Sequence, residues 1–525
     1  MITRRVLGGL AAVLTLVLLG STLTSAGQPK SDWPSWQKDL AGSRHNAAEW
    51  KLNPATVGKL KLKWAFAYPR EELDSPRSQP AVVDGTVFFG ATDGKFHARD
   101  AKTGAKRWEF SLSSVDPHVP GRTPRNGAAV VGGLVYFGDT SGYLYALDQR
   151  TGKVRWHNRL DPDPLAFLTS SPIVFNGKVY VGVSSGEVGG DANAPCCKFR
   201  GHLDAVDART GKLAWRYYTV PEAKQVGNWP SGAPRFEPSG VGVWSSPVVD
   251  AATKTVYVGT GQNYTGSAGD FDSLLALDTA TGAVRWKQQV TKADTWRLIC
   301  AVPDAPPGHC PGINDGTALD YDLGSTANIF TVRGRKMVGI GQKSGVYHVF
   351  DAVTGEVVWR RQLSTPQPNL GLTGIQWGTS YDGKALYIAT WRANPGALHA
   401  LDPATGDLLW KTPTPANGCD WGGAAQYRDL CELSMTPAVS STPGLVFEGS
   451  GDGKMRAFSA RNGRVLWEYD TMQNVQGVNG LPGRGGSLAG GGGAVIVDGM
   501  VYVQSGYWMP QYPNDRGHVM LAFGL

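Results

Sequence analysis

A repeated motif, D-x-x-T-G-x-x-x-W, constrains the fold of this chain more than any other feature of its sequence. Six full copies and a degenerate seventh, SARNGRVLW, end at Trp108, Trp156, Trp215, Trp286, Trp359, Trp410 and Trp467. Each follows an alternating strand pattern such as YLYAL, so Asp, Thr and Gly are expected to make a turn and Trp to lie on the next strand. Because a small sheet cannot bury its own face, these tryptophans are expected to pack between neighbouring units.

The spacing of the repeat predicts an all-β fold, an eight-bladed β-propeller spanning about residue 32 to residue 525. Successive motif glycines lie 48 to 73 residues apart, which suits four-stranded blades joined by loops of unequal length. The eighth blade is split: VGKLKLKW near the N-terminus supplies a turn and outer strand, whereas VYVQSGY and HVMLAF supply inner strands. Joining them closes the ring and removes free sheet edges. The 69 glycines and 18 tryptophans, with only 18% charged residues, fit turn-rich sheets.

The first 26 residues are predicted to be a secretory signal peptide. Arg4 and Arg5 precede an apolar run from Val6 to Gly20, and small residues lead to a cleavage site after Ala26. No later segment is apolar and long enough to cross a bilayer, so we expect an exported protein, periplasmic or extracellular. The formal charge of +7 is spread along the chain without a Lys/Arg cluster, which argues against nucleic-acid binding.

Six cysteines in an exported chain favour disulfides. Cys300 and Cys310 flank one long loop, and Cys419 and Cys431 flank another, so each pair is expected to cross-link its loop. Cys196 and Cys197 would then form a vicinal disulfide, free buried thiols being the alternative. No CxxCH motif for covalent haem attachment is present in the sequence.

One stretch of the third repeat unit is a candidate binding region. Ile173 to Ser184 is predicted to form a hairpin, since Asn176-Gly177 supplies the two positive-φ positions of a tight turn. At the end of its second strand, Glu187 stands among glycines and serines, where a cation or a polar ligand could bind.

The chain resembles the pyrroloquinoline quinone (PQQ)-dependent alcohol dehydrogenases, and most closely their polyvinyl-alcohol dehydrogenase branch. The resemblance rests on the repeat, on the opening DWPSWQKDLAGSRHN and on GVNGLPGRGGSLAGGG near the C-terminus, and it covers essentially the whole mature chain. The repeat alone is also found in scaffold propellers of outer-membrane assembly, so the site residues decide between an enzyme and a scaffold.

The resemblance implies a binding site for the quinone. Trp244 would lie flat against its rings, Thr169 and Ser184 would hydrogen-bond it, and Lys343 would contact its oxygens or the catalytic base. Arg125 is the candidate partner of a cofactor carboxylate, with Arg122 as competitor. The vicinal cysteines would roof the site or rigidify its loop.

The resemblance also implies a metal ion and a base. Glu187 would bind the metal together with the amide oxygen of Gln262 or Asn263, and these hard oxygen ligands suit Ca²⁺. Asp320 would be both a ligand and the catalytic base, assisted by Lys343. Asp322 matches the additional acid of lanthanide-using relatives, which makes a lanthanide the alternative metal. If residues 320 to 322 form a strand, both acids point the same way.

The implied function is oxidation of an alcohol, in particular a secondary or polymeric one such as polyvinyl alcohol, to the carbonyl compound. Without a haem motif in the chain, electrons would pass to an external acceptor such as a cytochrome c. Two alternatives stay open: a scaffold propeller without cofactor, and a PQQ-dependent sugar or polyol dehydrogenase. Substrate choice would lie in the long loops, residues 189–195, 291–316 and 416–434.

Overall fold

A computed structural model describes most of the chain after the expected signal peptide. The described residues are 1, 31–69, 77–116, 121–191, 193–302, 308–369, 371, 373–391, 395–425, 431–435, 437–488, 490–507 and 516–525. The predicted signal peptide lies almost entirely outside them. From Ser31 onward the chain forms one compact unit, and no helix within the described ranges is long and apolar enough to cross a membrane.

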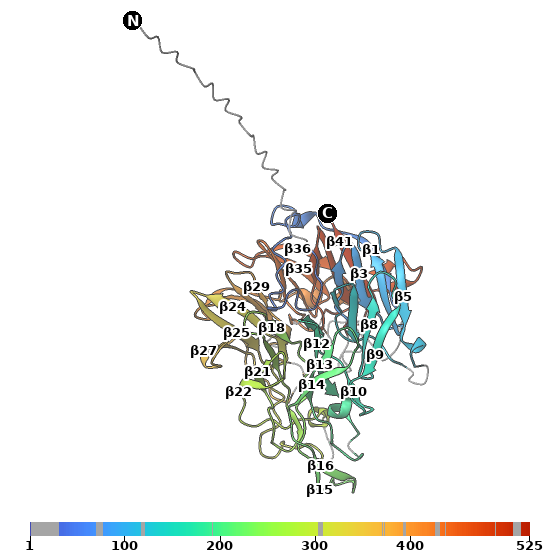
Figure 1. The fold of residues 1–525 in the computed structure, drawn as a ribbon. Coiled ribbons are helices and arrows are strands. Elements are labelled where there is room, and N and C mark those ends of the chain that lie inside the picture. The colour runs from blue at the N-terminus through green and yellow to red at the C-terminus, as the bar shows by residue number, and fades with distance from the viewer. Residues whose placement is uncertain are drawn as a thin grey trace. The chain divides into compact units, whose positions relative to one another are not determined.

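Eight four-stranded antiparallel sheets form the blades, as predicted (Figure 1). The first four blades are β2 (Ala81–Val83), β3 (Thr86–Gly90), β4 (Lys95–Asp100), β5 (Lys106–Ser111); β6 (Ala129–Val131), β7 (Leu134–Gly138), β8 (Tyr143–Asp148), β9 (Val154–Arg159); β11 (Ile173–Phe175), β12 (Lys178–Ser185), β13 (His202–Asp207), β14 (Leu213–Tyr218); and β18 (Val248–Asp250), β19 (Thr255–Gly259), β21 (Ser273–Asp278), β22 (Val284–Gln289).

The other four blades are β24 (Asn328–Val332), β25 (Arg335–Gly341), β26 (Val346–Asp351), β27 (Val357–Gln362); β29 (Ser380–Tyr381), β30 (Leu386–Ala389), β31 (Ala397–Leu401), β32 (Leu408–Pro413); β33 (Ser440–Thr442), β34 (Leu445–Gly449), β35 (Lys454–Ser459), β36 (Val465–Asp470); and β39 (Val495–Val497), β40 (Met500–Ser505), β41 (Val519–Gly524), β1 (Lys61–Ala67). The first strand of each blade contacts the first strand of the next, from β2 round to β39 and back to β2. The ring is therefore closed.

Shorter elements lie between the blades. They are β10 (Ala166–Phe167), which pairs antiparallel with the end of β12; the pairs β15 (Lys224–Asn228) with β16 (Pro234–Glu237), β17 (Ser239–Gly240) with β20 (Asn263–Thr265), β23 (Ser325–Thr326) with β28 (Trp377–Gly378), and β37 (Asn474–Gln476) with β38 (Pro482–Arg484); and the 3₁₀ turns η1 (Val57–Lys59), η2 (Leu112–Ser114), η3 (Gly186–Gly189), η4 (Leu298–Ala301) and η5 (Gly418–Asp420).

The repeat motif joins each blade to the next, which confirms the predicted packing. The ring of Trp108 lies on Gly152 of the following motif, where a Cβ would approach the indole to 2.6 Å, and its Nε1–H donates to the Gln149 carbonyl at 3.0 Å. Gly152 has a φ of +70°, so glycine is required there for both reasons. An indole hydrogen bond to a carbonyl of the next blade recurs at all eight blade junctions. Seven go to the equivalent turn residue and the eighth, from Trp467, goes to Leu60; the donors are Trp64, Trp108, Trp156, Trp215, Trp286, Trp359, Trp410 and Trp467.

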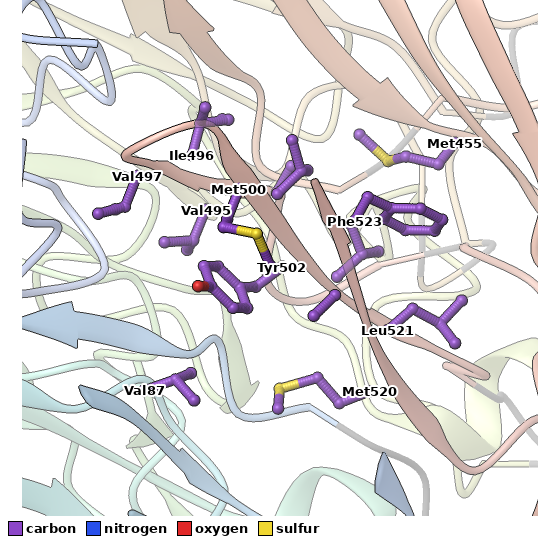
Figure 2. Packing of buried hydrophobic residues seen from close by; sticks show 14 of the residues in the cluster. Val87, Met455, Val495, Ile496, Val497, Met500, Tyr502, Met520, Leu521 and Phe523 are labelled. Carbon is purple, nitrogen blue, oxygen red and sulfur yellow. The ribbon is translucent and has the colours of Figure 1, made fainter. Parts of the chain in front are cut away.

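The closing blade combines both ends of the chain, as predicted. Strand β1 pairs antiparallel with β41 along its whole length, and the two lie side by side in Figure 1. Figure 2 shows the packing around it: Tyr502, Met520 and Phe523 lie among Val87 from the blade on one side and Met455 from the blade on the other. Burial of these apolar side chains holds the ring shut.

The segment that opens the described chain, residues 32–46, contacts the inner strands of successive blades in order. Main-chain bonds join it to β2, β6, β18, β24, β29 and β33, through Trp33, Pro34, Leu40, Ala41, Ser43 and Asn46. The side chain of Gln37 bonds the Ser171 and Pro247 carbonyls, and that of Asn46 bonds the Ile496 carbonyl in β39. This motif of the sequence therefore ties the inner ends of all eight blades together.

Candidate active site

Three charged side chains form the centre of the site. The ammonium of Lys343 lies 2.8 Å from Asp320 Oδ1 and 2.7 Å from Asp322 Oδ2, and all three residues are almost fully buried. Burial raises the pKa of Asp320 well above its usual range, although Lys343 opposes that shift. Burial lowers the pKa of Lys343, but the two carboxylates outweigh it and raise that pKa overall. The lysine therefore stays charged.

The two acids converge on Lys343, but not for the predicted reason. Residues 320–322 do not form a strand, and Asp320 has a φ of +60°. This left-handed conformation is unfavourable for a residue with a side chain. The segment is irregular backbone between blades four and five, so its shape is imposed by the residues around it rather than by sheet pairing.

Trp244 adjoins this centre. Its Nε1–H donates to Asp322 Oδ2 at 3.0 Å, and Lys343 Nζ lies 5.3 Å from its ring centroid. The indole lies against Gly324, where a Cβ would come within 2.0 Å of the ring, and Trp377 meets it edge-on with centroids 5.5 Å apart. The ring is thus held in one orientation by neighbours on several sides.

The two candidate amide ligands differ in their surroundings. Gln262 donates two hydrogen bonds: its main-chain N–H donates to Asp322 Oδ1 at 2.7 Å, and the nitrogen of its side-chain amide donates to the Trp296 carbonyl at 3.3 Å. Asn263 is completely buried, and neither atom of its amide has a hydrogen-bond partner among the described residues. A buried amide without partners is costly, and the oxygen of this amide is an atom that could bind a cation.

Glu187 follows β12 directly, within η3, as predicted. Its carboxylate accepts the main-chain N–H groups of Lys198 and Phe199, at distances from 2.8 to 3.1 Å. Burial raises the pKa of Glu187, and these two hydrogen bonds oppose the shift. The vicinal pair Cys196–Cys197 is disulfide-bonded and lies beside this carboxylate, so the glutamate and the disulfide turn form one unit.

The other two predicted disulfides, Cys300–Cys310 and Cys419–Cys431, are also formed. Within the described chain no cysteine is free. The alternative of free buried thiols at positions 196 and 197 is therefore wrong.

Tyr264 connects Glu187 with the central acids. Its hydroxyl donates to the Ser185 carbonyl at 3.2 Å. Burial raises the pKa of Tyr264, and the negative charges of Asp322, Glu187 and Asp320 add to this effect. All three acids that the sequence analysis named therefore lie around one tyrosine, which that analysis did not single out.

A pocket opens on Trp244 from the side of Arg125. The lining residues are Trp36, Arg77, Arg125, Asn126, Thr169, Trp244, Ser245, Ser246, Gly324, Trp377 and Gly491. Arg125 Nε donates to Thr169 Oγ1 at 3.0 Å, which brings two predicted cofactor residues together. The competitor Arg122 instead bonds the carbonyls of Leu112 and Asp116 and does not line this pocket. Ser184 is buried and bonds the Phe167 carbonyl.

Two further buried acids, Asp272 and Asp294, were missed by sequence reasoning. Burial raises the pKa of Asp294 to about 6, and burial together with Asp294 raises that of Asp272 well above its usual range. Asp294 contacts the main chain of Asp320. Their sequence signal is weak: Asp294 is an isolated acid, Asp272 follows Asp270 in the sequence GDFDS, and nothing local distinguishes either from a solvent-exposed acid.

Comparisons with known proteins identify the family. Residues 33–303 match the family described as the glucose/ethanol/alcohol dehydrogenase β-propeller domain, named PQQ, and residues 342–507 match that of the outer membrane protein assembly factor BamB. Polyvinylalcohol dehydrogenase of Pseudomonas sp is 32% identical over 94% of this chain and 77% of its own length. That of Sphingopyxis sp. (strain 113P3) is 34% identical over 91% and 73%.

A solved structure shares the fold. Quinohemoprotein alcohol dehydrogenase ADHIIG from Pseudomonas putida HK5 superposes with a TM-score of 0.68 over 94% of this chain and 80% of that one, at 22% identity. The family match spans half of the chain, and the two polyvinylalcohol dehydrogenases match most of it. The chain therefore belongs to the PQQ-dependent alcohol dehydrogenases and is a quinoprotein oxidoreductase.

Proposed function

We propose that this enzyme oxidises secondary hydroxyl groups of a polymeric alcohol such as polyvinyl alcohol and passes the electrons to a separate acceptor. The proposal of substrate rests on the two polyvinylalcohol dehydrogenases that match most of the chain. The single observation that carries the chemistry is the convergence of Lys343 on two buried acids beside the indole of Trp244.

The pocket residues suit a planar, polyanionic cofactor. An immobilised indole offers a stacking face, and Arg125 offers a guanidinium for a carboxylate. We assign Trp244, Arg125, Thr169, Ser184 and Lys343 to binding of the quinone. When bound, pyrroloquinoline quinone supplies the two-electron acceptor for the hydrogen on the carbinol carbon.

We assign the metal to the carboxylates of Glu187 and Asp320 and to the amide oxygen of Asn263. The buried amide of Asn263, which has no hydrogen-bond partner among the described residues, supports this choice; Gln262, whose amide nitrogen donates to a carbonyl, stays the alternative. Asp322 accepts hydrogen bonds from Trp244 and Gln262 and the ion pair from Lys343. We propose Ca²⁺, which these hard oxygen ligands suit, and a lanthanide with Asp322 as a further ligand stays the alternative.

We assign the base role to Asp320. Its Oδ1 faces Lys343, whereas its Oδ2 is buried without a hydrogen-bond partner among the described residues. Oδ2 is therefore the atom that takes the hydroxyl proton of the alcohol. Burial strengthens the carboxylate as a base, and the charge of Lys343 opposes this effect.

The acceptor and the compartment follow from the same family assignment. We propose that a soluble carrier such as a cytochrome c receives the electrons, since the sequence holds no CxxCH motif. We also propose that the enzyme works after export, in the periplasm or outside the cell, where its three disulfides are stable.

A substrate panel tests the proposal. The purified protein is loaded with PQQ and Ca²⁺, and reduction of a dye acceptor is followed with polyvinyl alcohol, small secondary alcohols, primary alcohols and aldose sugars. We expect activity on secondary alcohols, with the polymer among the best substrates. Activity confined to sugars would support the polyol alternative, and no activity despite bound quinone would support the scaffold alternative.

A further inference from the structure

Asp294 holds the main chain of the proposed base. Its Oδ1 accepts the N–H of Leu319 at 3.2 Å and that of Asp320 at 2.9 Å, and its Oδ2 accepts the N–H of Tyr321 at 2.6 Å. Three successive amides thus converge on one carboxylate, which lies about 25 residues earlier in the chain and is itself completely buried.

This arrangement differs from the other turn-capping acids of the chain. In the repeat motif an acid such as Asp278 accepts the amides of Ala280 and Thr281, two and three residues later in its own turn. Asp294 instead crosses between segments. It also holds a residue, Asp320, whose φ of +60° is unfavourable, and among the described residues no other acceptor bonds the amides of Asp320 and Tyr321.

The same short segment holds the proposed metal ligand Asn263. The Asp294 carbonyl accepts the N–H of Asn263 at 3.1 Å, and the N–H of Trp296 donates back to the Asn263 carbonyl at 2.9 Å. Residues 294–296 therefore fix the backbone of Asn263 through main-chain bonds and the backbone of Asp320 through the Asp294 side chain. Asp272 is also completely buried, and its carboxylate interacts with that of Asp294.

We propose that Asp294 is a positioning residue: by binding the amides of residues 319–321 it fixes the left-handed backbone of Asp320 and thereby aims Oδ2 at the substrate hydroxyl. The inference rests on the proposed role of Asp320 as base. An acid aimed by its own backbone conformation loses its alignment if that conformation relaxes, and small misplacements of a reacting group slow a reaction about 10²-fold.

The test compares Asp294→Asn with a matched change in the same blade, Asp278→Asn. An asparagine carries two donors where aspartate carries only acceptors, so at least one of the three amides loses its acceptor. Asp278→Asn disturbs a two-amide cap in a repeat-motif turn that holds no proposed site residue, and it controls for general loss of stability. Asp294→Ala removes all three bonds, and Asp320→Asn removes the base itself.

Two readouts are measured. The first is amide hydrogen exchange of the segment 317–323 in the quinone-free protein. The second is kcat per bound quinone together with KM and the affinity for PQQ and Ca²⁺, obtained by calorimetric titration. For Asp294→Asn we expect faster exchange in that segment and a fall in kcat per bound quinone of about tenfold or more, with KM within about threefold of wild type. The affinity for Ca²⁺ should weaken, because Asp320 is also a proposed metal ligand. Asp278→Asn should leave all of these values unchanged.

The inference is overturned if Asp294→Asn folds, binds cofactor and keeps the kcat of the wild type, or if segment 317–323 exchanges no faster. If Asp294→Ala does not fold, the Asp294→Asn variant still tests the inference. Failure of the underlying function looks different: Asp320→Asn would then retain activity, or the wild type would bind no quinone.

Discussion

Replacing Asn263 by alanine separates a metal ligand from a structural residue. Both atoms of its buried amide are without a hydrogen-bond partner among the described residues. Leaving a buried polar group unsatisfied costs roughly 1–3 kcal/mol. Removing the amide recovers that free energy, whereas the lost packing of a small side chain costs a comparable amount, about 1–2 kcal/mol. The free energy of unfolding of the metal-free Asn263→Ala protein should therefore differ from that of the wild type by no more than about 1–2 kcal/mol.

The metal-loaded protein should respond quite differently. Loss of one oxygen ligand should weaken Ca²⁺ binding at least about tenfold, so the stabilisation that saturating calcium and quinone give should fall by about 1.4 kcal/mol or more. Gln262→Ala is the matched control, because it removes the neighbouring amide, which is already bonded to the Trp296 carbonyl. We expect it to reduce stability in both forms and to leave calcium affinity nearly unchanged.

Urea unfolding with and without calcium and quinone, together with calorimetric calcium titration, measures both effects. The reasoning is refuted if Asn263→Ala lowers metal-free stability by more than about 3 kcal/mol while its calcium affinity stays at the wild-type value. It is also refuted if Gln262→Ala, rather than Asn263→Ala, abolishes calcium binding.

Three further predictions address the central lysine, the pH dependence of stability and the N-terminal segment. Lys343→Met leaves two buried carboxylates without their cation and should lower the free energy of unfolding by roughly 3–5 kcal/mol. Lys343→Arg keeps the positive charge and should lose much less. Urea unfolding of both variants measures this difference, and equal losses in the two variants would contradict the prediction. Burial, aided by Arg360, lowers the pKa of His348 to about 3. Below about pH 6.5 the unfolded chain therefore binds the proton and the folded chain does not, so the free energy of unfolding should fall by up to about 1.4 kcal/mol for each pH unit. His348→Gln should reduce this slope between about pH 6.5 and 4, and an equal pH dependence of unfolding in wild type and variant would rule the explanation out. Deleting residues 32–46 removes the hydrogen bonds of this segment to the inner strands and should lower the melting temperature by several degrees in calorimetric scanning. An unchanged melting temperature would show that the segment does not stabilise the ring.

The fold was predictable because the repeat motif itself contains the residues that pack one blade against the next. A tryptophan at a fixed offset from a glycine turn specifies both the blade and its contact with the next, and the unpaired strand patterns at the two chain ends specify the closing blade. The turn at Asn176-Gly177 was equally local: both residues have positive φ, 47° and 73°, as a tight hairpin requires.

The site was predictable only where its residues sit on regular elements. Glu187 lies where a strand ends, but Asp320 and Asp322 lie on irregular backbone, in which Asp294 binds the amides of residues 319–321. No local pattern encodes such a distant contact. The hydrogen-bond surroundings of Gln262 and Asn263, on which the proposed choice between them rests, were also beyond the sequence.

The most direct test of the account is calorimetric titration of the purified, metal-stripped protein with pyrroloquinoline quinone, with and without calcium. Glu187→Ala and Glu187→Gln are measured alongside, the second because its amide oxygen can still accept a main-chain N–H group of Lys198 or Phe199. We predict quinone binding that requires the metal and is lost in both variants while they remain folded. Binding without metal, binding unaffected by either variant, or no binding with calcium or lanthanum would contradict the account.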